Sequence, residues 1–187
     1  MTHRLLSNAL HEVFGEVRRL RQRFSYTADR AWEPVTAAAE LNVQLGHLAL
    51  CLLRRHGYDT AEWEDSERPR ASVGDELADV VLAALSIAVL SDTELTSTMN
   101  TAPRVSSDHE ALLRLVVAAG TLSESAMVAN QYRHRPTGRL PSLAEAASNV
   151  IAACELLAEQ LGLDLLAEFR AMVSDADAFL DGREEAP

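Results

Sequence analysis

The chain has 187 residues, a net charge of −11 and only 5% aromatic residues. Its length suits one domain with a substantial core, or two very small ones. The acidic balance argues against a nucleic-acid or anionic-membrane partner. All 17 basic residues are arginine, so a P-loop lysine and a lysine Schiff base are excluded.

Alanine and leucine dominate the composition, and no segment alternates like a β-strand, so we predict an all-α fold. Gly57 and Gly162 are predicted to stop helices. Ser72 with Asp75, and Ser142 with Glu145, have the spacing of capping boxes. The expected helices, in chain order, are 5–24, 37–56, 72–92, 108–132, 142–161 and 164–180.

The segment 93–107 is rich in Thr, Ser, Asn and Pro, which predicts a linker between units at 1–92 and 108–187. The second unit resembles a degenerate copy of the first. A shift of 69 pairs Glu76 with Glu145, whereas a shift of 70 pairs Asp79 with Asn149, so the register of the later helix stays open. The prediction is two tandem helical repeats packed as a pseudo-dimer. A shift of 74 superposes identical residues: Leu41, Val43, Gly46 and Leu48 over Leu115, Val117, Gly120 and Leu122.

Cys51 and Cys154 both fall in apolar helical stretches, which predicts buried free thiols in a reducing compartment. The chain does not open with a signal peptide, and the apolar run 80–90 is too short to span a bilayer. We therefore expect a cytoplasmic protein without a membrane partner, and leave homo-oligomerisation open.

The helix expected at 37–56 is apolar on most faces but carries a polar stripe. Glu40, Gln44 and His47 recur at i, i+4 and i+7, so they share one face. Polar groups within a buried helix need partners, and the nearest candidates are Glu76 and Asp79 on the next helix. Two helices that present acids and imidazole to each other can build a metal site in a bundle.

Each of these residues also has a structural interpretation. His47 can be a hydrogen-bonded core histidine, and Gln44 can be its hydrogen-bond partner. Glu76 and Asp79 lie near a helix N-terminus, where acids favour the macrodipole whatever the function. Trp32 can stack on a base or pack in the core.

The stretch Gln44-Leu-Gly-His47-Leu-Ala, followed by Asp75-Glu76-Leu-Ala-Asp79-Val-Val, resembles the MazG-like all-α nucleoside triphosphate pyrophosphohydrolase family. Members carry Glu-x-x-Glu on one helix and Glu-x-x-Asp on the next. The resemblance implies a helical bundle whose acids hold Mg²⁺ against nucleotide phosphates, with hydrolysis to a monophosphate and pyrophosphate.

The sequence departs from that pattern in the first motif, where Gln44 and His47 replace the two glutamates. Glu40, one turn earlier, is a candidate replacement. The expected metal set is then Glu40, His47, Glu76 and Asp79, with Mg²⁺ or Mn²⁺ as the ion, and imidazole favours the softer one. Glu76 and Asp79 are the candidate catalytic residues, and Gln44 and Trp32 the candidate substrate-binding residues.

Two functions follow from these residues. One is a metal-dependent pyrophosphohydrolase, or a diverged nucleotide-binding relative, that acts on a nucleoside triphosphate or a related small anionic nucleotide. The alternative is a catalytically inactive nucleotide-sensing or protein-interaction module on the same scaffold, in which the polar stripe is a hydrogen-bond network.

Overall fold

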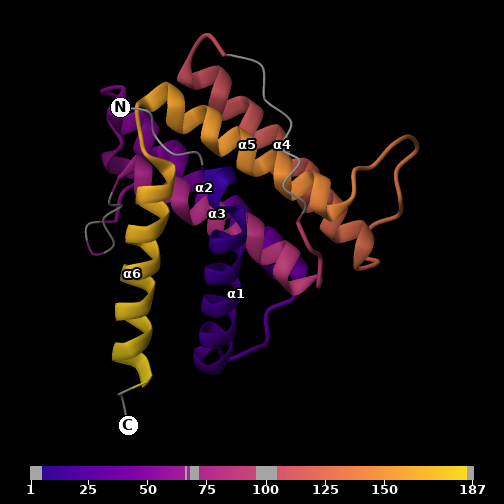
Figure 1. The fold of residues 1–187 in the computed structure, drawn as a ribbon. Helices are drawn as coiled ribbons and strands as arrows, with labels where there is room; N and C mark the ends of the chain where they lie inside the picture. The colour runs from indigo at the N-terminus through magenta and orange to yellow at the C-terminus, as the bar shows by residue number, and fades with distance from the viewer. Residues whose placement is uncertain (1–5, 66, 68–71, 96–104, 185–187) are drawn as a thin grey trace.

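The computed structural model describes residues 6–65, 67, 72–95 and 105–184, and Figure 1 shows their arrangement. Helices account for the regular structure, and the described residues contain no strand, which confirms the all-α prediction. The α-helices are α1 (Leu10–Thr27), α2 (Pro34–Arg55), α3 (Val73–Leu90), α4 (Asp108–Ala129), α5 (Leu143–Leu161) and α6 (Leu165–Glu184), with 3₁₀ helices η1 (Leu6–Ala9) and η2 (Ala61–Trp63).

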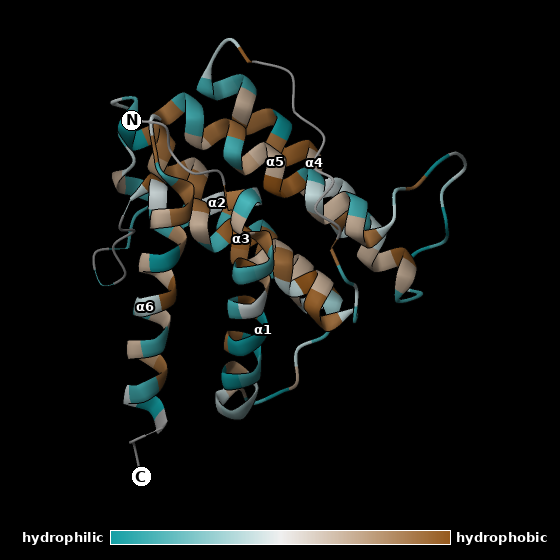
Figure 2. Ribbon diagram, viewed as in Figure 1, coloured by the Kyte–Doolittle hydropathy of each residue, from teal (hydrophilic) through white to brown (hydrophobic). Residues whose placement is uncertain are grey.

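Helix α3 is the centre of the bundle and packs against α1, α2, α5 and α6. Every residue from Val80 to Ala88 is buried. Figure 2 shows the reason in the sequence: α3 is largely hydrophobic, whereas α1 and α6 alternate hydrophilic and hydrophobic residues. A helix that is apolar on most faces must be covered on several sides, and the amphipathic α1 and α6 provide part of that cover. The predicted buried free cysteines are also confirmed, at Cys51 and Cys154.

The helices α2 and α3 form one antiparallel hairpin, and α4 and α5 form another that packs beside it (Figure 1). Their ends follow the same rules. The side-chain oxygens of Ser72 and Ser142 accept backbone N–H bonds from Asp75 and Glu145, each at 3.2 Å, as predicted. Ser107 caps α4 in the same way. The capping therefore sets where three of the four helices begin.

Each of these four helices ends in a residue with left-handed backbone, followed by an amide that bonds back to the helix. Gly57 has φ of 79° and Gly162 has φ of 69°, which confirms both predicted stops. Asp92 and Gln131 adopt the same conformation at the ends of α3 and α4, although neither is glycine. The sequence predicted helix ends near 92 and 132 but did not predict this left-handed backbone, because only glycine signals it clearly.

The two hairpins have closely matching dimensions. A shift of 74 places the N-cap Glu33 over Ser107 and the left-handed Gly57 over Gln131. A shift of 70 likewise superposes both ends of α3 and α5. At these shifts Glu40, Gln44, His47, Glu76 and Asp79 correspond to Arg114, Ala118, Thr121, Ala146 and Asn149, and we call each such pair counterparts.

Helices α2 and α4 meet at both ends. The hydroxyl of Tyr132, just beyond α4, donates to Glu33 at the start of α2 at 3.2 Å. At the opposite end, His56 of the α2 C-cap lies 2.7 Å from Asp108 of α4. By length and composition alone α2 and α4 could each cross a membrane, yet in this structure both pack within the bundle.

Candidate functional site

The polar stripe of α2 forms a continuous chain of hydrogen bonds. Gln44 Nε2 donates to Glu40 Oε1 at 2.7 Å, and Gln44 Oε1 lies 3.0 Å from His47 Nδ1. Since the amide oxygen can only accept, the proton of this second bond belongs to His47 Nδ1. The i, i+4 and i+7 spacing therefore orders three side chains along one helix face, as the sequence predicted.

Helix α3 places a buried carboxylate beside this row of hydrogen-bonded side chains. Glu76 is only 3% exposed, and its Oε2 lies 3.5 Å from His47 Nδ1. A buried carboxylate requires a polar partner, because an isolated buried charge costs several kcal/mol. His47 supplies one such partner. The expected approach of His47 to Glu76 across the hairpin is therefore present in the structure.

A cavity of about 400 Å³ lies where α1, α2, α3 and α6 meet, and this volume falls in the range of small-molecule sites. It combines both signs of charge with aromatic rings. Glu40, Gln44 and Asp79 line it from the hairpin. The other lining residues are Arg21, Phe24, Thr27, Ala28, Trp32, Leu82, Ala83, Phe179 and Arg183. We call this space the acidic-aromatic cavity.

Arg21 is the most unusual group in this cavity. Its guanidinium lies 4.7 Å from the Phe24 ring centre and 4.5 Å from that of Trp32. Burial lowers the pKa of Arg21 to about 10, although the negative charge of Glu40 opposes the shift. Arg21 is still cationic at neutral pH, and its buried Nε has no hydrogen-bond partner. A partly desolvated cation with a spare donor is a site that favours an anionic ligand.

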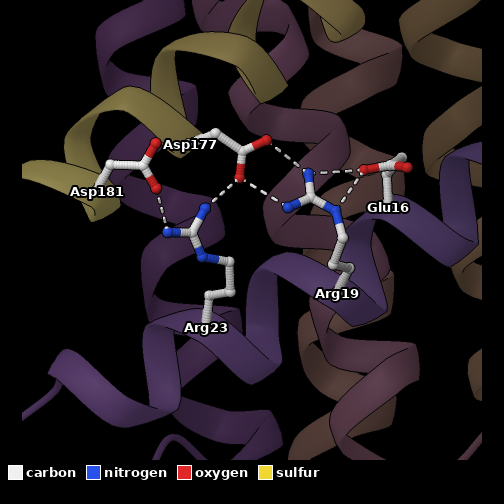
Figure 3. Close-up of polar contacts among 5 residues, drawn as sticks. All are labelled: Glu16, Arg19, Arg23, Asp177 and Asp181. Atoms are coloured by element: carbon white, nitrogen blue, oxygen red, sulfur yellow. Dashed lines mark hydrogen bonds and ion pairs between the residues drawn. The ribbon is translucent and has the colours of Figure 1, made fainter. Parts of the chain in front are cut away.

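The α6 wall of the cavity is held by ion pairs with α1, which Figure 3 shows. Arg19 makes two bonds to the carboxylate of Asp177, at 2.7 and 2.8 Å, and also binds Glu16. Arg23 bridges Asp177 and Asp181, at 2.7 and 2.6 Å. These bonds lower the pKa of Asp177. We call these five residues the α1–α6 clamp.

The clamp determines where the last turns of α6 lie, and therefore the position of two residues of the cavity wall. Phe179 and Arg183 both line the cavity, and the Arg183 guanidinium lies 5.0 Å from the Phe179 ring centre. A larger groove of about 500 Å³ between α1 and α6 is lined by clamp residues. Because those charges are already paired, this groove offers less to a ligand than the acidic-aromatic cavity does.

The residues that the sequence singled out fall into two groups in the structure, those that line the cavity and those that do not. Glu40, Gln44, Asp79 and Trp32 line the acidic-aromatic cavity, whereas His47 and Glu76 pair with each other and do not line it. In the described part of the chain, these residues do not form a group of three potential ligand atoms within 4.8 Å. For Glu40 and His47 the reason is helical geometry, since a spacing of seven residues corresponds to about 10.5 Å along the axis.

Two carboxylates facing one cavity still suit a hard cation. Mg²⁺ is usually held by one or two carboxylates together with phosphate oxygens of the substrate. Glu40 and Asp79 match that donor set without His47. The residues that the sequence did not single out are Arg21, Phe24, Phe179 and Arg183. The sequence did not indicate the two arginines as site residues, because arginines of an amphipathic helix normally face solvent.

A second hollow occupies the corresponding place on the other hairpin. It has a volume of about 410 Å³ and is lined by residues of α4 and α5. Four of these residues are Arg114, Ala118, Thr121 and Asn149, the counterparts of Glu40, Gln44, His47 and Asp79. The hollow therefore lies at the shifted positions, where neither Arg114 nor Asn149 offers a carboxylate.

Comparisons with protein-family models, with curated proteins and with solved structures find no match. The likeness to the MazG-like family therefore depends on the two sequence motifs alone, and the function has to be argued from the geometry of the cavity.

Proposed function

We propose that the acidic-aromatic cavity binds a nucleoside triphosphate, and that the protein is a diverged MazG-like pyrophosphohydrolase. The observation that carries the proposal is the composition of the cavity wall. Two arginines, two carboxylates and three aromatic rings surround about 400 Å³. Phosphates require cations, a base favours an aromatic face, and carboxylates can hold the divalent cation that accompanies a nucleotide.

Each group then has a role. Arg21 and Arg183 bind phosphate oxygens, and Trp32 offers its aromatic ring for stacking with the base. Glu40 and Asp79 hold the cation, which neutralises negative charge on the phosphates when it is bound. Asp79 also accepts a proton from the water that cleaves the bond between the α- and β-phosphates. The products are a nucleoside monophosphate and pyrophosphate.

Glu76 has a different role from Asp79, because it does not line the cavity. It contacts His47, which bonds to Gln44, which in turn bonds to Glu40. We assign Glu76 and His47 as positioning residues that fix the Gln44 amide and, through it, the Glu40 carboxylate. Their loss is expected to act through the geometry of Glu40.

The proposal includes a tandem arrangement, in which α4 and α5 are a second repeat packed against α2 and α3 as a pseudo-dimer. Matching helix ends at shifts of 74 and 70 support it. So does the hollow lined by Arg114, Ala118, Thr121 and Asn149. The second repeat lacks carboxylates at these positions and serves as scaffold.

The test is a screen of nucleoside triphosphates for pyrophosphate release, first with Mg²⁺ and then with Mn²⁺. We expect Asp79→Asn to lower the rate by at least about 100-fold, since a positioned acid or base contributes about 10²–10⁴. Glu40→Gln is expected to raise the required metal concentration. The matched control is Asn149→Ala in the second hollow, which should keep full activity.

The alternative is an inactive nucleotide-sensing or protein-interaction module. The observation that favours it is that Glu40, Gln44 and His47 are joined by hydrogen bonds, with Glu76 3.5 Å from His47, in the absence of any cation. Calorimetric melting with and without Mn²⁺ and nucleotide separates the two functions. Stabilisation by nucleotide without turnover supports the sensor, whereas a melting temperature unchanged by either ligand excludes both nucleotide functions.

A further inference from the structure

A group of metal-ligand side chains lies outside the acidic-aromatic cavity, at the junction of the two hairpins. His56 ends α2, and Asp108 and His109 begin α4. One potential ligand atom from each residue lies within 4.8 Å of the others. We call these three residues the junction cluster.

The carboxylate of Asp108 lies between the two imidazoles. Its Oδ2 is 2.7 Å from His56 Nε2, and its Oδ1 is 3.1 Å from His109 Nδ1. The two rings are themselves close, with centroids 4.7 Å apart and planes inclined by 33°. Each imidazole therefore presents a nitrogen toward the same carboxylate, where a proton is now shared and a metal ion could take its place.

We propose that His56, Asp108 and His109 bind a divalent transition metal such as Zn²⁺ or Co²⁺, which joins the two hairpins. Two imidazole nitrogens and one carboxylate are a donor set of the zinc type, and three protein ligands leave a fourth position open. Mg²⁺ is not expected at this site, because it prefers oxygen ligands.

The side chains have enough freedom to close around an ion. Ligand atoms about 2.0–2.2 Å from Zn²⁺ in a tetrahedral site lie about 3.3–3.6 Å apart. The His109 side chain is 66% exposed and that of His56 is 33% exposed, so small rotations of either ring are not blocked by core packing. The backbone N–H of His109 donates to Asp108 at 2.8 Å and orients the carboxylate. Such hydrogen bonds to a ligand improve a metal site.

The electrostatics of Asp108 also suit a cation. Burial opposes its ionisation, but the hydrogen bonds from His56 and from the His109 backbone outweigh that effect and lower the pKa of Asp108. The negative charge of Asp108 is therefore favoured at the place where the cation would bind. The other meeting point of α2 and α4 pairs Glu33 with Tyr132, whereas the grouped histidine and carboxylate ligands lie at the His56–Asp108 end.

The experiment is a titration of the full-length protein with Co²⁺, followed by its visible absorption and by calorimetry, with Zn²⁺ as competitor. We expect the Co²⁺ bound at the junction cluster to be displaced by Zn²⁺ and not by millimolar Mg²⁺. His56→Gln and His109→Gln should each weaken Co²⁺ binding by at least about tenfold, since even outer-shell changes cost about 10–100-fold. Bound Zn²⁺ should also raise the melting temperature.

Two controls make the result specific. His134→Gln changes an exposed histidine beyond the α4 end and should bind Co²⁺ like the wild type. Asp79→Asn alters the acidic-aromatic cavity and should also leave this binding intact, which keeps the two proposals separate. The proposal fails if wild-type protein does not bind Co²⁺, or if His134→Gln lowers the affinity as much as His109→Gln does. Circular dichroism confirms that each variant is folded.

Discussion

The two hairpins share their dimensions but differ in their surroundings. The hairpin α2–α3 contributes Glu40 and Asp79 to a cavity that α1 and α6 also line. The hollow at the corresponding place on α4–α5 is lined by residues of these two helices and carries apolar side chains at the surface. Leu113 is 65% exposed and Val117 is 70% exposed.

The comparison of the two hairpins shows that a buried polar side chain requires a polar partner on the neighbouring helix. Glu76 is buried beside His47, whereas their counterparts Ala146 and Thr121 make no such pair. Thr121 instead donates to the backbone oxygen of Val117 at 3.0 Å. Replacing both members of a polar pair costs little stability, while replacing one costs much. The α4–α5 hairpin can therefore fold without a polar pair at these two positions.

The largest expected effect comes from placing a carboxylate in the α4–α5 hairpin, which has no histidine at the position that corresponds to His47. Ala146 is wholly buried, so Ala146→Glu should lower the free energy of unfolding by about 3–5 kcal/mol, the cost of an uncompensated buried charge. Adding Thr121→His should recover about 1–2 kcal/mol, if the second hairpin can rebuild the pair of the first. Urea unfolding of the single and double variants measures both values.

Absence of any recovery in the double variant would show that the counterpart positions do not face each other as His47 and Glu76 do. Thr121→His alone is the control, because Thr121 is partly exposed and the substitution should change stability little.

A middle-sized effect tests whether the two hairpins contribute equally to the core. Leu48 and Leu122 are counterparts, and both are fully buried. Each Leu→Ala substitution should cost about 3 kcal/mol, within the range of about 2–5 kcal/mol for buried leucines. Thermal unfolding of the two variants gives the comparison. A difference of more than about 2 kcal/mol would mean that the matching dimensions hide unequal packing.

The smallest expected effect concerns the α1–α6 clamp, which joins the two helices that pack against the α2–α3 hairpin. Asp177→Asn should lower the free energy of unfolding by about 1 kcal/mol at neutral pH, because partly exposed ion pairs contribute about 0–1 kcal/mol each. The hydrogen bonds from Arg19 and Arg23 lower the pKa of Asp177 against the effect of burial. Its stabilising contribution is therefore complete above the unfolded pKa of about 3.9 and declines as the pH falls further.

The difference in stability between wild type and Asp177→Asn should accordingly shrink below about pH 4. Hydrogen exchange should show faster opening of α6 in the variant and unchanged protection in α4 and α5. Equal loosening of α4 would contradict the assignment of the clamp to one side of the molecule.

Much of the fold was predictable from local sequence. Capping serines, helix-stopping glycines and the almost unbroken apolar run of α3 are each read over a few residues, because their physical cause is local. The left-handed backbone of Asp92 and Gln131 was not predicted, since a non-glycine residue enters that region only when its surroundings favour it.

The candidate site was predictable only in part. The sequence alone placed Glu40, Gln44 and His47 on one face, because helical periodicity determines which side chains share a face. Only the tertiary structure separated Asp79, which lines the cavity, from Glu76, which is buried against His47. The cavity's cations come from α1, the helix that precedes α2, and from α6, which lies more than a hundred residues further along the chain. Which side of a helix another helix covers depends on packing between distant segments, and packing decides which charges meet.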